Sequence, residues 1–149
     1  MTIERVTEAD LAELLPLVRA YCDFYEVAPS DEALLSLSRA LIADPEHEGF
    51  QLLARNEGRA VGFATIFWSW ATTSAEQIGV MNDLFVAPEA RGTGVAEALI
   101  EACRAECAVR GAGKLTWQTA PDNAAAMKVY DRIGATREQW VDYSLSVEV

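Results

Sequence analysis

The stretch LFVAPEARGTGVAEALI, residues 84–100, joins a strand-like pattern to a helix-like pattern through a short turn. An apolar run precedes the turn, and apolar residues recur at helical spacing after Gly94. Gly92 and Gly94 let a backbone approach a ligand closely, and Arg91 adds a positive charge. Because the first N–H groups of a helix have no intrahelical partners, we expect this glycine turn, residues 91–96, to hold an anion such as a pyrophosphate.

Two common phosphate-binding motifs do not match the glycine turn. A Walker loop requires the pattern GxxxxGK[ST], with a lysine for the phosphates, and the chain has no such pattern. A dinucleotide-binding turn has a third small residue where Glu97 stands, and it follows the first strand of its domain rather than a late strand. The alternatives that remain are a different phosphate ligand and an ordinary tight connection between a strand and a helix.

The composition predicts one globular domain, because 51% of the 149 residues are hydrophobic and only 23% are charged. No apolar run reaches membrane-spanning length, and the first residues, MTIERVTEADL, lack the pattern of a secretion signal. We therefore expect a cytoplasmic protein without membrane contact. The formal net charge of −11 argues against a nucleic-acid-binding protein, which needs a basic face. The same charge favours a cationic partner, although many enzymes are acidic for no such reason.

The three cysteines fit free thiols in a reducing compartment. Cys103 and Cys107 lie one helical turn apart, which suits either two small residues on a buried face or a pair of metal ligands, and Cys22 stands alone. The chain has one histidine, His47, and neither an HExxH nor a CxxC pattern. We expect a buried pair of cysteines and no metal site.

The remaining patterns predict an α/β protein in which helices flank one mixed sheet. Thr7 and Asp10 suggest a capping box before a helix that contains Pro16, where a kink or a break is expected, and Ser30 precedes a second helix. Two β-rich runs flank the turn at residues 56–58 and predict a hairpin. The expected order is β-α-α-β-β-β-α-β-α-β, with elements at residues 2–6, 8–25, 31–42, 50–55, 59–70, 78–86, 95–110, 114–120, 122–132 and 140–149.

Two longer motifs point to a known family. Residues 91–96, RGTGVA, fit the pattern R/Q-x-x-G-x-G/A, and residues 122–135, DNAAAMKVYDRIGA, place Asn123 seven residues before Tyr130. In these motifs, and in its expected element order, nearly the whole chain resembles the GNAT superfamily of N-acetyltransferases. The stretch MNDLFV, residues 81–86, further resembles the polyamine and thialysine branch and a histone/polyamine branch of that superfamily.

The resemblance implies a single-domain fold over residues 1–149, with a mixed and mostly antiparallel sheet, and acetyl-CoA as the cosubstrate. Two neighbouring strands, one ending at Val86 and one at residues 114–119, would splay apart and receive the pantetheine between them. The strand backbone would pair with the pantetheine amides, and the glycine turn would hold the pyrophosphate. The implied cofactor-binding residues are Leu84, Phe85, Val86, Arg91, Gly92, Thr93, Gly94, Val95, Ala96, Asn123 and Tyr130.

Acetyl transfer to an amine requires the removal of a proton, because an alkyl amine with a pKa of about 10.4 is mostly protonated at neutral pH. The resemblance gives Tyr130 the role of general acid at the departing CoA sulfur, and it places oxyanion-binding N–H groups on a bulged strand near Leu84 and Phe85. Asn82 stands where the polyamine enzymes have a glutamate, so the expected base is Asp83 or a water held by Asn82. The alternatives are a structural carboxylate at Asp83 and a packed aromatic at Tyr130.

Two candidate regions remain for the acceptor. The stretch DFYE, residues 23–26, ends the first helix and resembles a segment of the polyamine branch, so Tyr25 and Glu26 are expected to contact a cationic acceptor. Trp68 and Trp70 alternate on a strand and face one side, where they would stack on an alkylammonium group or fill the core or a dimer interface. The resemblance also implies a homodimer paired through the final strand.

Taken together, these patterns predict an acetyl-CoA-dependent N-acetyltransferase that works by direct transfer in a ternary complex. The expected acceptor is a primary amine on a polyamine, a lysine-like small molecule, an aminoglycoside-type compound or a protein lysine. Since Asn82 replaces a catalytic glutamate, the alternative is a catalytically silent module that only binds acyl-CoA.

Overall fold

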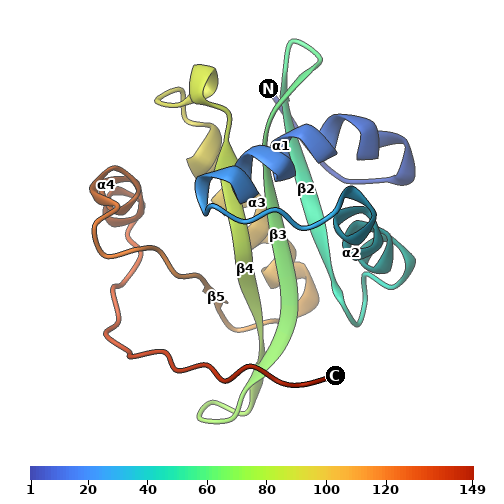
Figure 1. Ribbon diagram of the computed structural model, residues 1–149. Helices are drawn as coiled ribbons and strands as arrows, with labels where there is room; N and C mark the ends of the chain where they lie inside the picture. The colour runs from blue at the N-terminus through green and yellow to red at the C-terminus, as the bar shows by residue number, and fades with distance from the viewer. The chain divides into compact units, whose positions relative to one another are not determined.

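The computed structural model describes residues 1–149 as two compact units, Met1–Gln118 and Thr119–Val149 (Figure 1). The first unit holds a five-stranded sheet with its helices, and the second holds one helix, α4 (Ala124–Arg132). In chain order the first unit contains β1 (Thr2–Arg5), α1 (Leu11–Phe24), α2 (Asp31–Ala43), β2 (Gly49–Asn56), β3 (Arg59–Ala71), β4 (Glu76–Val86), α3 (Val95–Arg110) and β5 (Leu115–Thr116), with short 3-10 helices at Glu8–Asp10 and Pro88–Ala90. No helix in the structure combines the length and the apolar character that a membrane crossing needs.

The strands lie side by side in their chain order, β1 to β5. All pairs are antiparallel except β4 with β5. The predicted hairpin of β2 and β3 turns at Glu57 and Gly58, whose φ values are 50° and 76°. Positive φ at both central residues is typical of a type I′ turn, whose twist matches that of the paired strands. The predicted fold class, an α/β protein with a mixed and mostly antiparallel sheet, is therefore confirmed.

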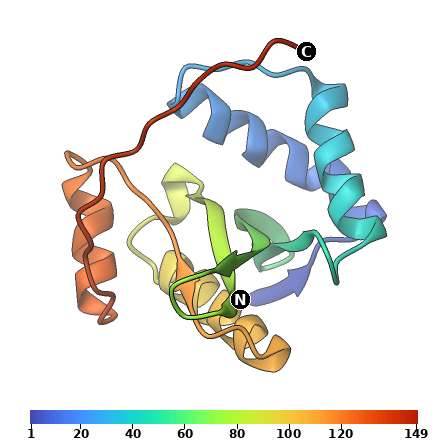
Figure 2. The same ribbon diagram turned by 90° about the horizontal axis from the view of Figure 1, so that it is seen from below.

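Helices cover both faces of the sheet in the first unit: α1 and α2 lie on one face and α3 on the other (Figure 2). The main apolar cluster lies under α1 and consists of Val6, Leu11, Leu14, Leu17, Leu53, Phe63, Phe85 and Ala87. On the opposite face, Cys107 of α3 lies against Gly79 of β4. Cys103 and Cys107 are buried free thiols, as predicted for two small residues on one helical face, and burial raises both thiol pKa values.

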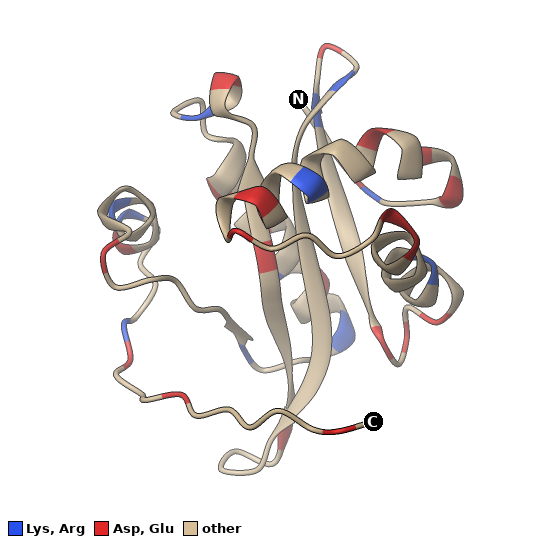
Figure 3. Cartoon of the chain, viewed as in Figure 1, with Lys and Arg blue, Asp and Glu red and all other residues tan.

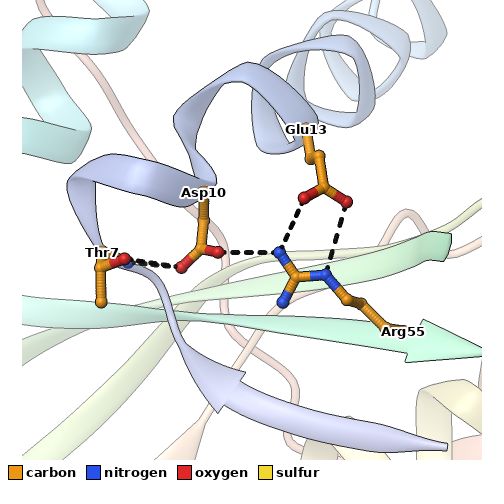
Figure 4. Close-up of polar contacts among 4 residues, drawn as sticks. All are labelled: Thr7, Asp10, Glu13 and Arg55. Atoms are coloured by element: carbon orange, nitrogen blue, oxygen red, sulfur yellow. Dashed lines mark hydrogen bonds and ion pairs between the residues drawn. The ribbon is translucent and has the colours of Figure 1, made fainter. Parts of the chain in front are cut away.

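α2 begins where its capping residue predicts, whereas the capping box of Thr7 and Asp10 starts a 3-10 helix, Glu8–Asp10, and α1 follows only from Leu11. The Ser30 hydroxyl accepts a backbone N–H from the first turn of α2 at 3.1 Å. The Asp10 carboxylate accepts the Thr7 amide at 2.8 Å and the Thr7 hydroxyl at 3.0 Å (Figure 4). Arg55 of β2 reaches across to Asp10 at 2.8 Å and to Glu13 at 3.1 Å. These contacts fasten the start of α1 to the sheet.

Pro16 lies inside α1, which runs from Leu11 to Phe24 without the break that the sequence suggests. Proline removes one N–H donor and its ring crowds the preceding turn. Pro16 is on the exposed side of the helix, while Leu14 and Leu17 beside it are buried in the core. Packing of the apolar face therefore outweighs the local cost of the proline.

The second unit contains α4, which begins after Asn123 and ends before Gly134, where φ is 85°. The strands predicted at residues 140–149 are wrong, because residues 135–149 form neither helix nor strand. Alternation of apolar and polar residues suits a half-buried strand, but a strand also needs a neighbouring backbone to pair with. No strand of the sheet pairs with this segment.

Candidate active site

The glycine turn connects β4 to α3 within the first unit. Gly92 and Gly94 both have left-handed backbone conformations, with φ values of 76° and 88°, and a Cβ added at either position would meet no atom within 4 Å. α3 starts directly afterwards at Val95, which is buried. The turn therefore has open space beside both glycines, directly before the start of a helix. This geometry fits the phosphate ligand that the sequence predicts.

Two side chains of the glycine turn brace its conformation. The Thr93 hydroxyl donates to the Ala90 carbonyl. Arg91 donates from Nε to the Val86 carbonyl at 3.0 Å, and its guanidinium carbon lies 5.6 Å from the centre of the Phe85 ring. Arg91 therefore fixes the end of β4 while it keeps a positive charge beside the turn.

Along β4, the backbone N–H and C=O groups of successive residues point alternately toward β3 and away from it. The Ala87 N–H donates to a β3 carbonyl at 2.8 Å, so the Phe85 backbone also faces β3, while the Leu84 and Val86 backbones face away from it. On that far side, the ladder with β5 ends at Val80. The strand predicted at residues 114–120 is accordingly shorter, with only Leu115–Thr116 paired.

This divergence of β4 and β5 is the splay that the resemblance implies. Leu84 and Val86 turn their backbone groups toward the side where β5 diverges. Phe85 does not, because its backbone faces β3 and its ring is only 8% exposed in the core. Phe85 therefore supports the edge through packing.

β4 bulges at Asn82. Thr65 of β3 lies opposite Asp83, and the next β3 residue lies opposite Met81, so Asn82 is the extra residue. The bulge therefore lies two residues before Leu84, whereas the resemblance places it near Leu84 and Phe85. Asn82 is exposed, whereas the neighbouring Asp83 is partly buried.

The Asp83 carboxylate is surrounded by hydrogen-bond donors. Asn82 Nδ2 donates at 2.9 Å, and the Thr65 and Tyr21 hydroxyls are close enough to lower the pKa of the carboxyl. Burial raises the pKa of Asp83 above its ordinary value, and these three groups offset that rise only in part. A carboxylate with a raised pKa is a stronger proton acceptor than an exposed one, which is the property that a general base needs.

Tyr21 of α1 is a site residue that the sequence patterns do not single out. Its hydroxyl lies 3.3 Å from the Asn82 carbonyl, and its ring meets the Phe85 ring edge-on at 6.3 Å. Burial, with the nearby charge of Asp83, raises the pKa of Tyr21, so the hydroxyl stays protonated and donates. Tyr21 lies seven residues after Leu14, and this helical spacing could have marked it as core-facing.

The segment after α1 brings Tyr25 beside Tyr21, with ring centres 5.1 Å apart. Glu26 follows with a φ of 57°, which is strained for a residue other than glycine. Acidic residues gather at the end of α1 and the start of α2 (Figure 3). This acidic segment, residues 23–32, contains Asp23, Glu26, Asp31 and Glu32. Its charge suits a cationic acceptor.

Trp68 and Trp70 share a face of β3, but it is the face under α3. The Trp68 indole N–H donates to the Pro45 carbonyl at 3.0 Å, and the guanidinium of Arg110 lies 4.4 Å from the indole ring. Tyr25 belongs to the α1 face, so the structure does not bring it together with Trp68. Trp68 has the packing role, and its cation partner is an arginine of the same chain. Trp70 is 68% exposed near the end of β3.

Asn123 and Tyr130 belong to the second unit. The Asn123 side-chain oxygen accepts the Ala126 N–H at 3.3 Å, which caps α4 and leaves the amide nitrogen for another partner. Tyr130 lies two helical turns further on, and its carbonyl accepts the Ala135 N–H at 3.0 Å. The cofactor and catalytic roles of these two residues stay predictions.

Comparisons with known proteins agree with this geometry. The acetyltransferase (GNAT) family matches residues 14–135. The uncharacterized N-acetyltransferase YhfO of Bacillus subtilis strain 168 is 30% identical over 148 residues, which cover 99% of this chain and 98% of that protein. The crystal structure of a probable acetyltransferase has a TM-score of 0.86 at 27% identity and covers 100% of this chain and 99% of its own.

A further solved structure shares the fold at lower identity. The aminoglycoside N-acetyltransferase AAC(6')-Iy, in complex with the bisubstrate analogue CoA-S-monomethyl-acetylneamine, has a TM-score of 0.84 at 22% identity, with 98% of each chain covered. The two sequence motifs, the splayed sheet and the family match all lead to the same superfamily. The chain therefore belongs to the acetyltransferase (GNAT) family and is an N-acetyltransferase of that type.

Proposed function

We propose that this N-acetyltransferase transfers the acetyl group of acetyl-CoA to a primary amine by direct attack in a ternary complex. The observation that carries the proposal is the arrangement of β4. Within five residues it has a bulge at Asn82, a held carboxylate at Asp83 and a backbone edge at Leu84 and Val86 that faces away from β3. The glycine turn follows directly along the chain.

The proposed cofactor site uses backbone groups more than side chains. Leu84 and Val86 would pair with the pantetheine amides, and the N–H groups of residues 91–96 would hold the pyrophosphate. Acetyl-CoA, when bound, supplies the thioester carbonyl that the amine attacks. Backbone N–H groups beside the bulge would stabilise the oxyanion. From the family resemblance we assign Asn123 to the cofactor and Tyr130 as the proton donor to the departing sulfur.

Asp83 is the proposed proton acceptor for the attacking amine. Asn82 has no basic atom, but its amide nitrogen holds the Asp83 carboxylate at 2.9 Å. Asp83 thus supplies, one residue later in the chain, the carboxylate that the polyamine enzymes have at the position of Asn82. Asp83→Asn should lower kcat by about a hundredfold or more at neutral pH, and the Tyr130→Phe variant should lose thiol release.

The proposed acceptor carries at least one further positive charge. The acidic segment, residues 23–32, and the formal net charge of −11 both favour a cation. Tyr25 offers a ring face and Glu26 a carboxylate for the second charge. These features suit a polyamine or a lysine-like small molecule, with a protein lysine as the larger substrate of the same chemistry.

The test of the function is release of CoA thiol from acetyl-CoA in the presence of polyamines, lysine analogues, aminoglycosides and a basic peptide. Saturable turnover with one class is the expected result, and it would identify the acceptor class. Tight acetyl-CoA binding without turnover for any amine in the panel would favour the silent acyl-CoA-binding module instead.

The glycine turn can be tested with a matched pair of variants. Gly94→Glu should abolish acetyl-CoA binding measured by calorimetry, because it places a carboxylate at the phosphate site. Gly111→Glu is the control, since Gly111 ends α3 with a φ of 82° and its added Cβ also meets no atom within 4 Å. Both variants carry the same kind of backbone strain and the same charge. Equal loss of binding in both would remove the glycine turn from the cofactor site.

We further propose that the chain works as a homodimer. The family resemblance supports this, since it implies that the end of the chain meets a second copy. Light scattering should give twice the 16.3 kDa mass of the chain. A monomer that retains full turnover would contradict the proposal.

A further inference from the structure

A row of three polar side chains crosses the sheet under α1, beside the main apolar cluster. Gln51 of β2 lies opposite Thr65 of β3, and Thr65 lies opposite Asp83 of β4. Gln51 is 5% exposed and Thr65 is fully buried. This polar row, Gln51, Thr65 and Asp83, therefore runs from the interior of the sheet to the candidate base.

The hydrogen bonds in the polar row have a direction. Gln51 donates from Nε2 to Thr65 Oγ1 at 3.1 Å. An amide nitrogen only donates, so the Thr65 oxygen is the acceptor and its single proton is available for the next residue. Asp83 is the neighbour of Thr65 on the next strand, and the Thr65 hydroxyl is close enough to lower the pKa of that carboxyl. Gln51 thus leaves the proton of the Thr65 hydroxyl for Asp83.

The polar row lowers the stability of the fold, and side-chain packing does not explain why it is present. Gln51 Oε1 is buried and has no hydrogen-bond partner. A buried acceptor without a partner is destabilising, and an apolar side chain of the same length would avoid the penalty. Gln51 uses only the donor group of its amide, and this group binds Thr65, the residue opposite Asp83.

We propose that Thr65, oriented by Gln51, is a positioning residue that holds the Asp83 carboxylate in place to accept the proton of the amine. The inference rests on the proposed function, since it concerns the base of that reaction. The other groups that face Asp83 are Asn82, which hydrogen-bonds to it, the Tyr21 hydroxyl and the ionisable side chain of Cys22, while Tyr25 lies beside Tyr21. Among the hydrogen-bond donors, only Thr65 approaches from the buried interior of the sheet.

The test compares Thr65→Val with Thr65→Ser in the full-length enzyme. Valine keeps the shape of threonine and removes the hydroxyl, so Asp83 loses a donor that favours its ionised form. The acidic limb of the pH profile of kcat/KM should move to higher pH by about one unit. At a pH below the limb, kcat/KM should therefore fall about tenfold. Thr65→Ser keeps the hydroxyl, so its acidic limb should coincide with that of the wild-type enzyme. An unshifted limb in Thr65→Val, or a serine variant no better than valine, would overturn the inference.

Gln51→Met gives a second readout, which a purely structural residue would not produce. Methionine keeps the length of the side chain but removes both the donor and the unpartnered oxygen. Thermal unfolding should occur at a higher temperature, while the acidic limb moves in the same direction as in Thr65→Val. A variant that is less stable and has an unshifted limb would contradict the positioning role.

The inference can fail separately from the proposed function. Carbon-13 NMR titration of the Asp83 carboxyl in wild type and in Thr65→Val measures the shift without any turnover. If Asp83→Asn keeps full activity, the assignment of the base is wrong, and the positioning role is wrong with it. If Asp83→Asn is inactive but the carboxyl titrates identically in the two proteins, only the role of Thr65 is wrong.

Discussion

At the scale of single residues, Asp83 carries a conflict between stability and chemistry. Its folded-state pKa is raised by burial, so the folded protein holds the proton more tightly than the unfolded chain does. The stabilising contribution of such a group is fully present at low pH and is lost as the pH rises through the folded pKa. Where the carboxylate is ionised in the folded protein, its burial therefore destabilises the fold.

This conflict predicts that Asp83→Asn is more stable than wild type although it is inactive. Urea unfolding at pH 7 should show a gain of about 1 kcal/mol, because the variant removes the cost of a buried charge. The gain should shrink as the pH falls toward 3.8, the ordinary pKa of the side chain, since wild-type Asp83 then becomes neutral. A variant that is less stable than wild type at both pH values would contradict this account.

At the scale of secondary-structure elements, Arg55 links the start of α1 to β2. The Arg55 and Asp10 side chains are 16% and 19% exposed, so their ion pair is better shielded than the surface pairs (Figure 4). Burial acts to raise the pKa of Asp10, but hydrogen bonds from Thr7 and Arg55 outweigh it and the pKa is lowered. This contribution is present above the unfolded-state pKa and is lost as the pH falls through the lower folded value.

We expect Arg55→Met to lower the free energy of unfolding by about 1 kcal/mol at pH 7, because Asp10 loses its guanidinium partner. The deficit should narrow below pH 3.8, the ordinary pKa of Asp10. Arg39→Met is the matched control, since Arg39 pairs with Glu8 at 2.8 Å in an exposed setting and should cost nothing measurable. Equal losses in both variants would mean that shielding of the Arg55 pair has no effect on its strength.

The β2–β3 hairpin gives a second prediction for an element. Glu57 occupies the first central position of its type I′ turn with a φ of 50°, where asparagine is favoured. Glu57→Asn should raise the free energy of unfolding by about 0.5 kcal/mol. Glu57→Gln removes the same charge but keeps the unfavourable backbone, so it should give a smaller gain. Identical gains would assign the effect to charge alone.

At the scale of the whole molecule, the formal net charge of −11 should attract a cationic acceptor and be screened by salt. Between about 0.01 and 0.15 M ionic strength the Debye length falls from about 30 to about 8 Å. The KM for a diamine should rise several-fold over this range with little change in kcat, and the KM for a monoamine should rise less. A diamine KM that is independent of salt would contradict electrostatic attraction of the acceptor.

Much of the fold and part of the candidate site could be predicted from the sequence. The glycine turn, the cap at Ser30 and the hairpin turn at residues 56–58 are set by neighbours within a few residues, so their patterns were sufficient. The location of the candidate base was also predictable, since Asp83 directly precedes the strand edge that leads into the glycine turn.

Other features depended on which segments meet. The polar row exists because the registers of β2, β3 and β4 align Gln51, Thr65 and Asp83, and no local pattern encodes register across three strands. Tyr21 reaches Asn82 across 61 positions of the chain. Trp68 shares its strand face with Trp70 as the alternation predicts, but only packing decided that α3 covers that face.

The sequence by itself determined the element types in the first unit, the glycine turn before α3 and the family, because these follow from local conformational preferences and short motifs. The tertiary structure alone decided the position of the bulge at Asn82, the donors around Asp83, the short β5 and the lack of strands in residues 135–149. The physical reason is that strand pairing and burial join residues far apart in the chain. A side chain's pKa, and a strand's existence, depend on those partners.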